Sequence, residues 1–365
     1  MSKFIWIDAA TPKYALFFSY LMPHLHDAGL DTLVTTRYSE NYTEAKSVLD
    51  MRGLDYHLTG NYGGETVAGK FRARTSRQLE FLELFDKTGM PDAVLCGSVV
   101  DSIQTGFGLG MEVINFCDTP IRGSEFRYED ITIVTKLTVM LSSLLFHPFV
   151  IPRDVFSRMG VDPARVITHD FIDVCLWMNS LEKNEENDFR RRYGLDISKP
   201  TIMIREEEFK AHYVHEKLSV LYELIPRIAD EVDANIVILP RYEIEPLKER
   251  FGEYAVVLEE KLPIESFYPF IDFLVGGGGT MNLEAACYGI PVLSLRSLLL
   301  FHDVYLIENG MMSWTNDADE ALDIVKRNLG VKRDNRDYFS RGECSAAKLA
   351  EKIGRYMEGG LQALS

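Results

Sequence analysis

Four consecutive glycines separate a short apolar run from a helical pattern in the stretch VGGGGTMNLEAACYGIPVLSL, residues 275–295. Glycine costs about 1 kcal/mol per residue relative to alanine in regular structure, so a run of four needs a reason. A strand that leads through a glycine turn into a helix directs backbone N–H groups and the positive helix end toward one place. This order favours a bound anion such as a phosphate. The alternative is a turn that only permits tight packing.

A carboxylate lies close to this turn. Glu284 is on the first turns of the helix expected over residues 280–288, which Gly289 and Pro291 terminate. Its oxygens could accept hydrogen bonds from ribose hydroxyls beside a bound diphosphate. The alternative is a favourable negative charge near a helix N-terminus.

Other phosphate and metal motifs fail in their sequence context. GETVAGKF, residues 64–71, has P-loop spacing, but Phe71 stands where a magnesium-binding hydroxyl is required. No GxGxxG follows the first expected strand, which disfavours a dinucleotide fold of the dehydrogenase type. Asp317 and Asp319 form a DxD that opens an expected helix, where the dipole alone favours acidic residues. We therefore predict no metal site.

The elements that must position these residues alternate between short β-branched runs and amphipathic segments, which predicts parallel sheets with crossover helices. The length of 365 residues favours two domains. We predict one α/β domain over residues 1–175 and a second over residues 176–345, with the hinge near residues 173–183. Residues 346–365 form a final helix that we expect to pack across the domain junction.

Composition narrows the partners. Lys and Arg total 39 against 55 Asp and Glu, and the net charge of −16 disfavours a nucleic-acid partner. Five cysteines lie far apart without a CxxC pair, as in reduced cytoplasmic proteins. Asp8 interrupts the first apolar run, unlike a signal peptide, and the most apolar stretch, residues 131–151, contains Lys136, His147 and Pro148. We expect a cytoplasmic protein without an integral membrane segment, and the oligomeric state stays open.

The glycine stretch and the following PVLSL resemble the nucleotide-binding segment of GT-B glycosyltransferases and of non-hydrolysing UDP-N-acetylglucosamine 2-epimerases. Along nearly the whole chain, the sequence is most similar to a family of proteins of unknown function, numbered three-five-four. The matching stretches are FIWIDAATPKYALFFSYLMPHLHDAGLDTLVTTR, VLCGSVVDSIQTGFGLGMEVINFCDTP, TKLTVMLSSLLFHPFVIP, IVILPR and VGGGGTMNLEAACYGIPVLSL. The resemblance implies an α/β GT-B fold, in which two Rossmann-like parallel-sheet domains face a central cleft.

The resemblance also implies a nucleotide-sugar substrate, with a UDP-sugar favoured, and no separate cofactor. The diphosphate would be held by backbone N–H groups of one turn, from Gly277, Gly278, Gly279 and Thr280. Glu284 would hold the ribose. Arg205 and Arg241, which end TIMIR and NIVILPR, would offset charge on the leaving diphosphate; the alternative for both is an interdomain ion pair.

Two aspartates end expected strands of the first domain. Asp8 ends FIWID, and Asp118 follows INFC. A carboxylate at the carboxyl end of a strand is a candidate general base for a hydroxyl acceptor. Asp8 could instead cap the helix that begins near Thr11, and Asp118 has the same ambiguity.

The chain departs from the related families at positions that carry their catalytic groups. Tyr14 stands where the family of unknown function usually has a histidine. The epimerases have an acid–base aspartate where this chain has Ser98, and a histidine and a glutamate where it has Asn115 and Cys117. The epimerase reaction would therefore lack its usual proton-transfer groups.

The sequence and the resemblance together predict an enzyme, a metal-independent glycosyltransferase that moves a sugar from a nucleotide to a hydroxyl acceptor. Two alternatives remain: a nucleotide-sugar epimerase or hydrolase, and a noncatalytic protein that binds a nucleotide-sugar. The acceptor is not identified by sequence. A basic stretch, formed by Lys70, Arg72, Arg74 and Arg77, could meet an anionic acceptor or form a solvated helix face.

Overall fold

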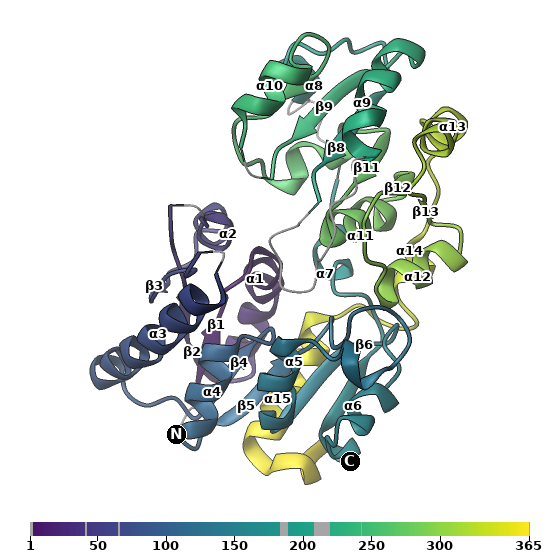
Figure 1. The fold of residues 1–365 in the computed structure, drawn as a ribbon. Coiled ribbons are helices and arrows are strands. Elements are labelled where there is room, and N and C mark those ends of the chain that lie inside the picture. Colours follow the sequence, from purple (N-terminus) through teal and green to yellow (C-terminus); the bar gives the residue numbers. More distant parts are fainter. Residues whose placement is uncertain are drawn as a thin grey trace. The chain divides into compact units, whose positions relative to one another are not determined.

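The computed structural model describes residues 3–40, 42–64, 66–182, 189–207, 220–241 and 243–364. The chain divides into two compact units (Figure 1). The first comprises Met1–Trp177 and Gly342–Ser365, and the second comprises Met178–Arg341. The second unit is therefore one continuous segment, whereas the first is assembled from two. The chain first passes from one unit to the other between Trp177 and Met178, within the hinge predicted over residues 173–183. The last residue of this hinge, Lys183, lies outside the described residues.

In the described part of the first unit, seven strands form one sheet in the order β3-β2-β1-β4-β5-β6-β7. All neighbouring strands run parallel. The strands are β1 (Lys3–Asp8), β2 (Leu30–Thr36), β3 (His57–Leu58), β4 (Ala93–Cys96), β5 (Glu112–Phe116), β6 (Leu144–Pro148) and β7 (Val166–His169). The carboxyl ends of these strands share one edge, so the residues that follow them are brought together.

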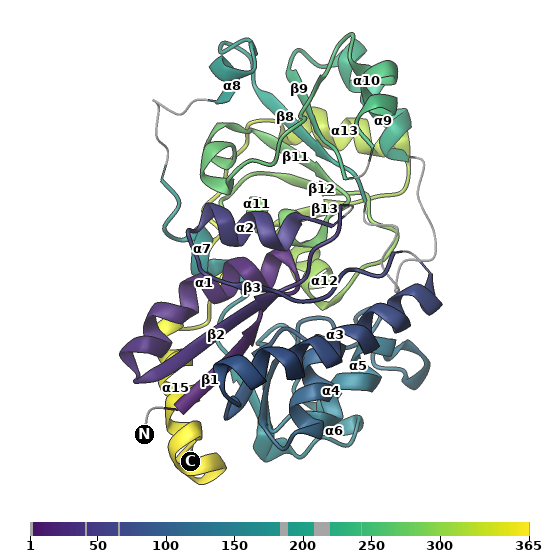
Figure 2. The ribbon, with the colours of Figure 1, turned by 90° about the vertical axis from the view of Figure 1, so that its left-hand side faces the viewer.

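Helices cover both faces of this sheet. They are α1 (Pro12–Asp27), α2 (Glu44–Met51), α3 (Val67–Thr88), α4 (Val100–Gly108), α5 (Ile133–Thr138), α6 (Asp154–Arg158), α7 (Cys175–Met178), which ends one residue beyond the unit boundary, and α15 (Ala346–Gly359). In Figures 1 and 2, α1 and α15 lie on one face and α3 and α4 on the other. The core under α3 and α4 includes Trp6, whose ring meets those of Phe81 and Phe85 edge to face.

The described part of the second unit contains six parallel strands in the order β10-β9-β8-β11-β12-β13. They are β8 (Thr201–Arg205), β9 (Asn235–Leu239), β10 (Val256–Val257), β11 (Phe273–Gly276), β12 (Val292–Ser294) and β13 (Met312–Trp314). The helices are α8 (Phe189–Arg192), α9 (Val220–Glu231), α10 (Glu245–Phe251), α11 (Gly279–Cys287), α12 (Phe301–Glu308), α13 (Ala318–Asn328) and α14 (Arg336–Phe339).

Two parallel sheets flanked by helices confirm the predicted α/β architecture of two Rossmann-like units. The final helix, α15, belongs to the first unit, where it packs on α1. Its apolar side, which includes Leu349 and Ile353, is buried. Among the described residues, no helix is both long enough and apolar enough to cross a bilayer.

A buried histidine in β6 predicts how stability depends on pH. His147 donates from Nδ1 to the carbonyl oxygen of Pro148 (3.1 Å), and its Nε2 accepts from the Thr168 hydroxyl (2.9 Å). Burial lowers the pKa of His147 to about 4. The unfolded chain takes up a proton as the pH falls below about 6.5, whereas the folded chain does so only near its lowered pKa.

The stability that neutral His147 contributes is thus complete above about pH 6.5 and is lost as the pH falls toward 4, by about 3 kcal/mol. Denaturant unfolding at pH 7 and pH 4.5 measures this loss. In His147→Gln, which cannot titrate there, the loss should shrink by about 2 kcal/mol. An equal loss in both proteins would show that His147 is not the group responsible.

Candidate functional site

The glycine turn of the second unit lies at the carboxyl end of β11. Gly278 is the N-cap of α11, and no side chain caps this helix among the described residues. The first-turn N–H groups are therefore available to an anion. The N–H of Gly277, in contrast, donates to the carbonyl oxygen of Arg205 at 2.9 Å. The prediction that the Gly277 N–H binds the diphosphate is therefore corrected, because this N–H already donates a hydrogen bond within the protein.

Packing explains some of the glycines and leaves one unexplained. A Cβ at Gly277 would lie 2.4 Å from the backbone of Glu207, and a Cβ at Gly276 would lie 1.7 Å from Asn282 Oδ1. At Gly278 a Cβ would meet only Arg205 Cγ, at the ordinary contact distance of 3.4 Å. Gly278 has extended backbone angles, φ −106° and ψ 119°, which any residue can adopt. Neither packing nor backbone conformation requires a glycine at this position.

Two arginine side chains lie beside the turn. Arg205 ends β8 and donates from Nη1 to the carbonyl oxygens of Leu239 (3.2 Å) and Pro240 (2.5 Å). Arg296 follows β12, and its Nη1 would lie 3.1 Å from a Cβ at Gly279. Arg296 also pairs with Asp303 at 2.5 Å, and both side chains are buried. The aliphatic part of the Arg205 side chain therefore borders Gly278, and the guanidinium of Arg296, paired with Asp303, lies next to Gly279 at the start of α11.

Arg296 was not among the residues selected from the sequence, although its position was informative. It follows the strand that pairs with β11, so its backbone reaches the same edge of the sheet. Arg241 was predicted to lie near the diphosphate. It lies beyond the end of β9, where its backbone N–H donates to Glu206 Oε2 at 2.9 Å. The structure thus brings Arg205 and Arg296 to the glycine turn, whereas Arg241 belongs to the neighbouring strand end.

Glu284 is buried in the second turn of α11. Its Oε2 accepts a hydrogen bond from the Tyr268 hydroxyl at 2.6 Å. Tyr268 belongs to the 3₁₀ turn Tyr268–Phe270, which precedes β11. Burial, reinforced by the negative charge of Glu284, holds the pKa of Tyr268 well above its usual value. The tyrosine stays protonated and fixes the orientation of the carboxylate.

Asp8 lies at the centre of a buried ion network in the first unit. Its two oxygens accept from Arg77 Nη1 (2.9 Å) and Nη2 (2.6 Å), and Arg77 Nη1 also donates to Asp101 at 2.7 Å. Asp8 and Arg77 are completely inaccessible to solvent. The hydroxyl of Thr11, not Asp8, caps α1. We therefore correct the assignment of Asp8 as a general base, because its carboxylate is engaged on both oxygens and cannot reach an acceptor.

Asp118 lies in a second, more open cluster. Its Oδ2 accepts from Lys13 Nζ, and Lys13 also pairs with Asp173 at 2.6 Å. Asp173 in turn bonds His169 Nε2 at 2.7 Å. The side chain of Asp118 is 27 % exposed, whereas that of Asp173 is 2 % exposed. Asp118 is therefore the carboxylate of this cluster that a ligand can reach.

The charges in this cluster stabilise one another. Burial opposes the charge of Lys13, but Asp118 and Asp173 hold its pKa above the usual value. Burial would raise the pKa of Asp173, but Lys13 and the bond to His169 hold it below the usual value. Lys13 thus remains a cation with two anionic partners. Lys13 lies in the first turn of α1, and the sequence did not predict it as a site residue because its partners Asp118 and Asp173 are distant in the chain.

Ser98, which follows β4, is the one non-glycine residue with positive φ (53°) in the described part of the chain. Its N–H and hydroxyl both donate to Asn115 Oδ1, at 2.9 and 3.0 Å. These bonds hold a left-handed conformation that is uncommon for serine. Asn115 and Ser98, both positions where the chain departs from the epimerases, therefore bond each other.

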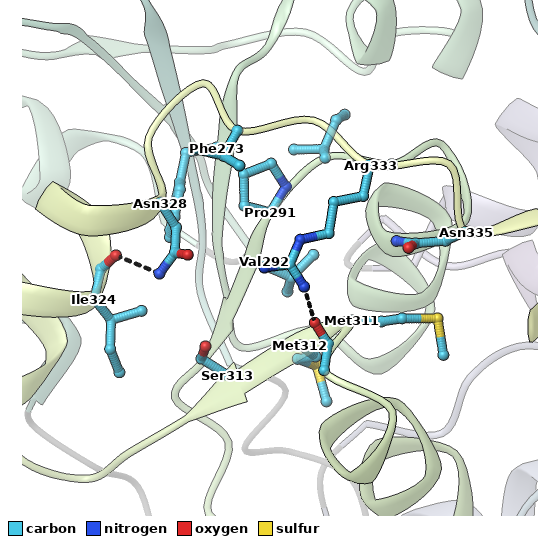
Figure 3. Close-up of a pocket in the computed structure, with 14 residues that line it drawn as sticks. Phe273, Pro291, Val292, Met311, Met312, Ser313, Ile324, Asn328, Arg333 and Asn335 are labelled. Atoms are coloured by element: carbon cyan, nitrogen blue, oxygen red, sulfur yellow. Dashed lines mark hydrogen bonds between the residues drawn. The ribbon is translucent and has the colours of Figure 1, made fainter.

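No group of three or more His, Cys, Asp or Glu side chains in the described ranges could hold a metal ion. A small cavity of about 60 Å³ lies elsewhere in the second unit, at the amino ends of β11, β12 and β13 (Figure 3). Arg333 and Asn328 line it, and Arg333 Nη1 donates to the carbonyl oxygen of Gly310 at 2.7 Å. This volume suits about two water molecules. The cavity lies at the edge opposite the glycine turn.

The family model described as Protein of unknown function (DUF354) matches residues 3–357. The chain belongs to this family. An uncharacterized protein from Methanocaldococcus jannaschii is 28 % identical over 333 residues, covering 90 % of this chain and 92 % of that protein. The resemblance to this family is thereby confirmed.

Solved structures with similar folds extend beyond the DUF354 family. The UDP-GlcNAc 2-epimerase of M. jannaschii, in complex with UDP-GlcNAc and UDP, has a TM-score of 0.73 at 17 % identity, covering 97 % of this chain and 99 % of that chain. The epimerase of Neisseria meningitidis bound to UDP-GlcNAc has a TM-score of 0.75 at 14 % identity, with coverages of 96 % and 99 %. A spinosyn rhamnosyltransferase complexed with its aglycone has a TM-score of 0.56 at 14 % identity, with coverages of 98 % and 96 %. At these identities the likeness shows the shared GT-B-type fold.

Proposed function

We propose that this DUF354 protein is a metal-independent glycosyltransferase that takes a sugar from a nucleoside diphosphate, foremost UDP, to a hydroxyl acceptor. Gly278 is the observation that carries the proposal. A glycine that neither packing nor φ requires stands at the uncapped start of α11, beside Arg205 and Arg296. A bare backbone at this place permits close approach by a diphosphate.

The residues of the second unit divide the work of binding. The N–H groups of Gly278, Gly279 and Thr280 and the dipole of α11 bind the diphosphate, and Glu284 binds the ribose. Arg205 and Arg296 stabilise the charge that develops on the diphosphate as the glycosidic bond breaks. In this proposal the two arginines supply the positive charge at the leaving group, so the reaction needs no metal.

Asp118 is the candidate base for the acceptor hydroxyl. It is accessible, it follows β5 at the carboxyl edge of the first sheet, and Lys13 fixes its orientation. We expect Asp118→Asn to lower kcat about a hundredfold, because general-base catalysis typically contributes at least this factor. Binding of UDP, which contacts the second unit, should be unchanged.

The matched control for Asp118→Asn is Asp86→Asn, the same change at an exposed position of α3. Turnover with a transferable sugar and calorimetric binding of UDP are measured for both variants. Equal turnover by Asp118→Asn and the wild type would remove Asp118 from the reaction. Loss of UDP binding in Asp118→Asn would show that the change acts on substrate binding and not on proton transfer.

A nucleotide-sugar epimerase or hydrolase is the second candidate. The TM-scores with 2-epimerases exceed the score with the rhamnosyltransferase, which favours this alternative. Against it, the chain has Ser98, Asn115 and Cys117 at the positions that resemble the epimerase acid–base groups. A noncatalytic nucleotide-sugar-binding protein is the third candidate.

One NMR experiment separates the three candidates. The wild-type protein is mixed with UDP-GlcNAc and other nucleotide-sugars, and the sugar signals are followed for several hours, first alone and then with hydroxyl acceptors. Binding with an unchanged sugar until an acceptor is added supports the transferase. A new sugar signal without an acceptor supports the epimerase or hydrolase, and binding without any turnover supports the third candidate. No binding by any nucleotide-sugar would contradict the proposed function.

A further inference from the structure

A group of basic and aromatic side chains gathers at the carboxyl edge of the first sheet, away from the residues assigned so far. This basic–aromatic patch consists of Arg37, Tyr42, Tyr62, Lys70 and Arg74. Arg37 follows β2, Tyr42 and Tyr62 lie in the loops on either side of α2 and β3, and Lys70 and Arg74 lie on α3. Two loops and a helix thus supply one surface.

The aromatic rings organise the cations of the patch. The rings of Tyr42 and Tyr62 stack with centroids 4.5 Å apart and planes 7° apart. The guanidinium of Arg37 lies 5.4 and 5.5 Å from the two ring centroids, and Lys70 Nζ lies 5.3 Å from that of Tyr62. Cation–π contacts at these distances help to hold a cation in place.

One buried donor of each arginine lacks an acceptor among the described residues. Among the described residues, the Nε atoms of Arg37 and Arg74 are buried without a hydrogen-bond partner. Among the described residues, neither guanidinium has a carboxylate within ion-pair distance. The guanidinium of Arg74 lies over the ring of Phe71, 4.7 Å from its centroid. Buried donors without acceptors are costly, and the oxygens of a phosphate match the planar fork of a guanidinium.

The spacing along α3 selects which of its four cations reach the patch. Lys70 and Arg74 are four residues apart and share one face of the helix, whereas Arg72 lies on another face. Arg77, one turn beyond Arg74, points into the core toward Asp8 and Asp101. The basic stretch therefore divides into a structural arginine, a surface arginine and two members of the patch.

We propose that the basic–aromatic patch binds a phosphate group on the acceptor, so that the sugar is transferred to a phosphorylated hydroxyl compound. This inference rests on the proposed function, because only a glycosyltransferase would use the phosphate compound as an acceptor. The phosphate binds the guanidinium groups of Arg37 and Arg74, and the stacked tyrosines keep Arg37 in place. The same phosphate chemistry occurs in a soluble phosphomonoester and in a phospholipid headgroup.

Calorimetry with the full chain tests this proposal, with saturating UDP present so that the glycine turn is occupied. The two probes are glucose 1-phosphate and phosphatidylcholine vesicles that contain phosphatidic acid. We expect one of the probes to bind. Arg37→Ala and Arg74→Ala should each weaken this binding about tenfold, the typical effect of removing a charged hydrogen-bond partner. The preferred probe identifies the source of the phosphate.

Arg72→Ala is the matched control, since it removes the same charge from another face of the same helix. It should change the affinity by less than about twofold. If neither probe binds, or if Arg72→Ala weakens binding as much as Arg74→Ala does, the proposal is overturned. The melting temperature of each variant shows whether it is folded. If Arg37→Ala does not fold, Arg74→Ala provides the second test.

Binding of UDP, measured separately, keeps the two proposals apart. If UDP binds and neither phosphate probe binds, the proposed function is retained and the proposed phosphate site is rejected. Phosphate-probe binding that depends on Arg37 and Arg74, in a protein that binds no nucleotide, would keep the patch as an anion site and remove the proposed function.

Discussion

Gly278→Val is expected to weaken UDP-sugar binding about a thousandfold while the second unit stays folded. The new side chain would stand at the N-terminus of α11, next to Arg205, where the diphosphate is expected to bind. Loss of two hydrogen bonds to a charged group, at about 2 kcal/mol each, gives this factor. Fold retention is expected because a Cβ at this position makes an ordinary contact and the backbone is extended. Calorimetry with UDP and a thermal melt measure the two effects.

Gly277→Ala is the contrasting variant. Its Cβ would lie 2.4 Å from the Glu207 backbone, so we expect this variant to lose stability first. Substitution of the two neighbouring glycines should therefore have different effects: Gly278→Val loses UDP binding, whereas Gly277→Ala loses stability. Normal UDP binding by a folded Gly278→Val protein would show that the turn does not hold the nucleotide.

Arg77→Met is expected to lower the free energy of unfolding of the first unit by about 4 kcal/mol. The change leaves two buried carboxylates, Asp8 and Asp101, without their common cation, and removal of one member of a buried ion network typically has this cost. The carbonyl oxygen of Thr59 also loses the donor at Arg77 Nε. At about 3 °C per kcal/mol for a unit of this size, the melting temperature should fall by roughly 12 °C.

Two further variants test the cause of this loss. Arg72→Met, on the exposed side of the same helix, should change stability by less than about 0.5 kcal/mol. Combining Arg77→Met with Asp8→Asn and Asp101→Asn should restore part of the stability, because no uncompensated charge then remains buried. If the triple variant is as unstable as Arg77→Met alone, lost packing on Phe81 and not charge explains the effect.

The fold followed from the sequence because its signals are local. Alternation of β-branched runs with amphipathic segments gives parallel strands with helical crossovers, and this pattern held in both units. The glycine turn before α11 was equally readable, since a strand, a turn and a helix are consecutive in the chain. Arg205 could be placed near that turn because β8 ends at the same sheet edge.

The partners of buried charges were not readable, because they depend on contacts between distant segments. Asp8 and Arg77 are 69 positions apart, and nothing near Arg77 in the sequence distinguishes it from the exposed Arg72. The cluster around Asp118 likewise joins residues of α1 and β7 and of the segments that follow β5 and β7. The hydrogen bond that occupies the Gly277 N–H depends on strand pairing in register, which composition and periodicity do not specify.

The two-segment composition of the first unit has a consequence for protein synthesis. Met178–Arg341 leave the ribosome as one uninterrupted stretch, so the second unit can fold as soon as it has emerged. The first unit must wait for Gly342–Ser365, because α15 covers α1 with buried residues such as Leu349 and Ile353. During this interval the apolar surface of α1 is uncovered, and chaperone binding to the nascent chain should be strongest there.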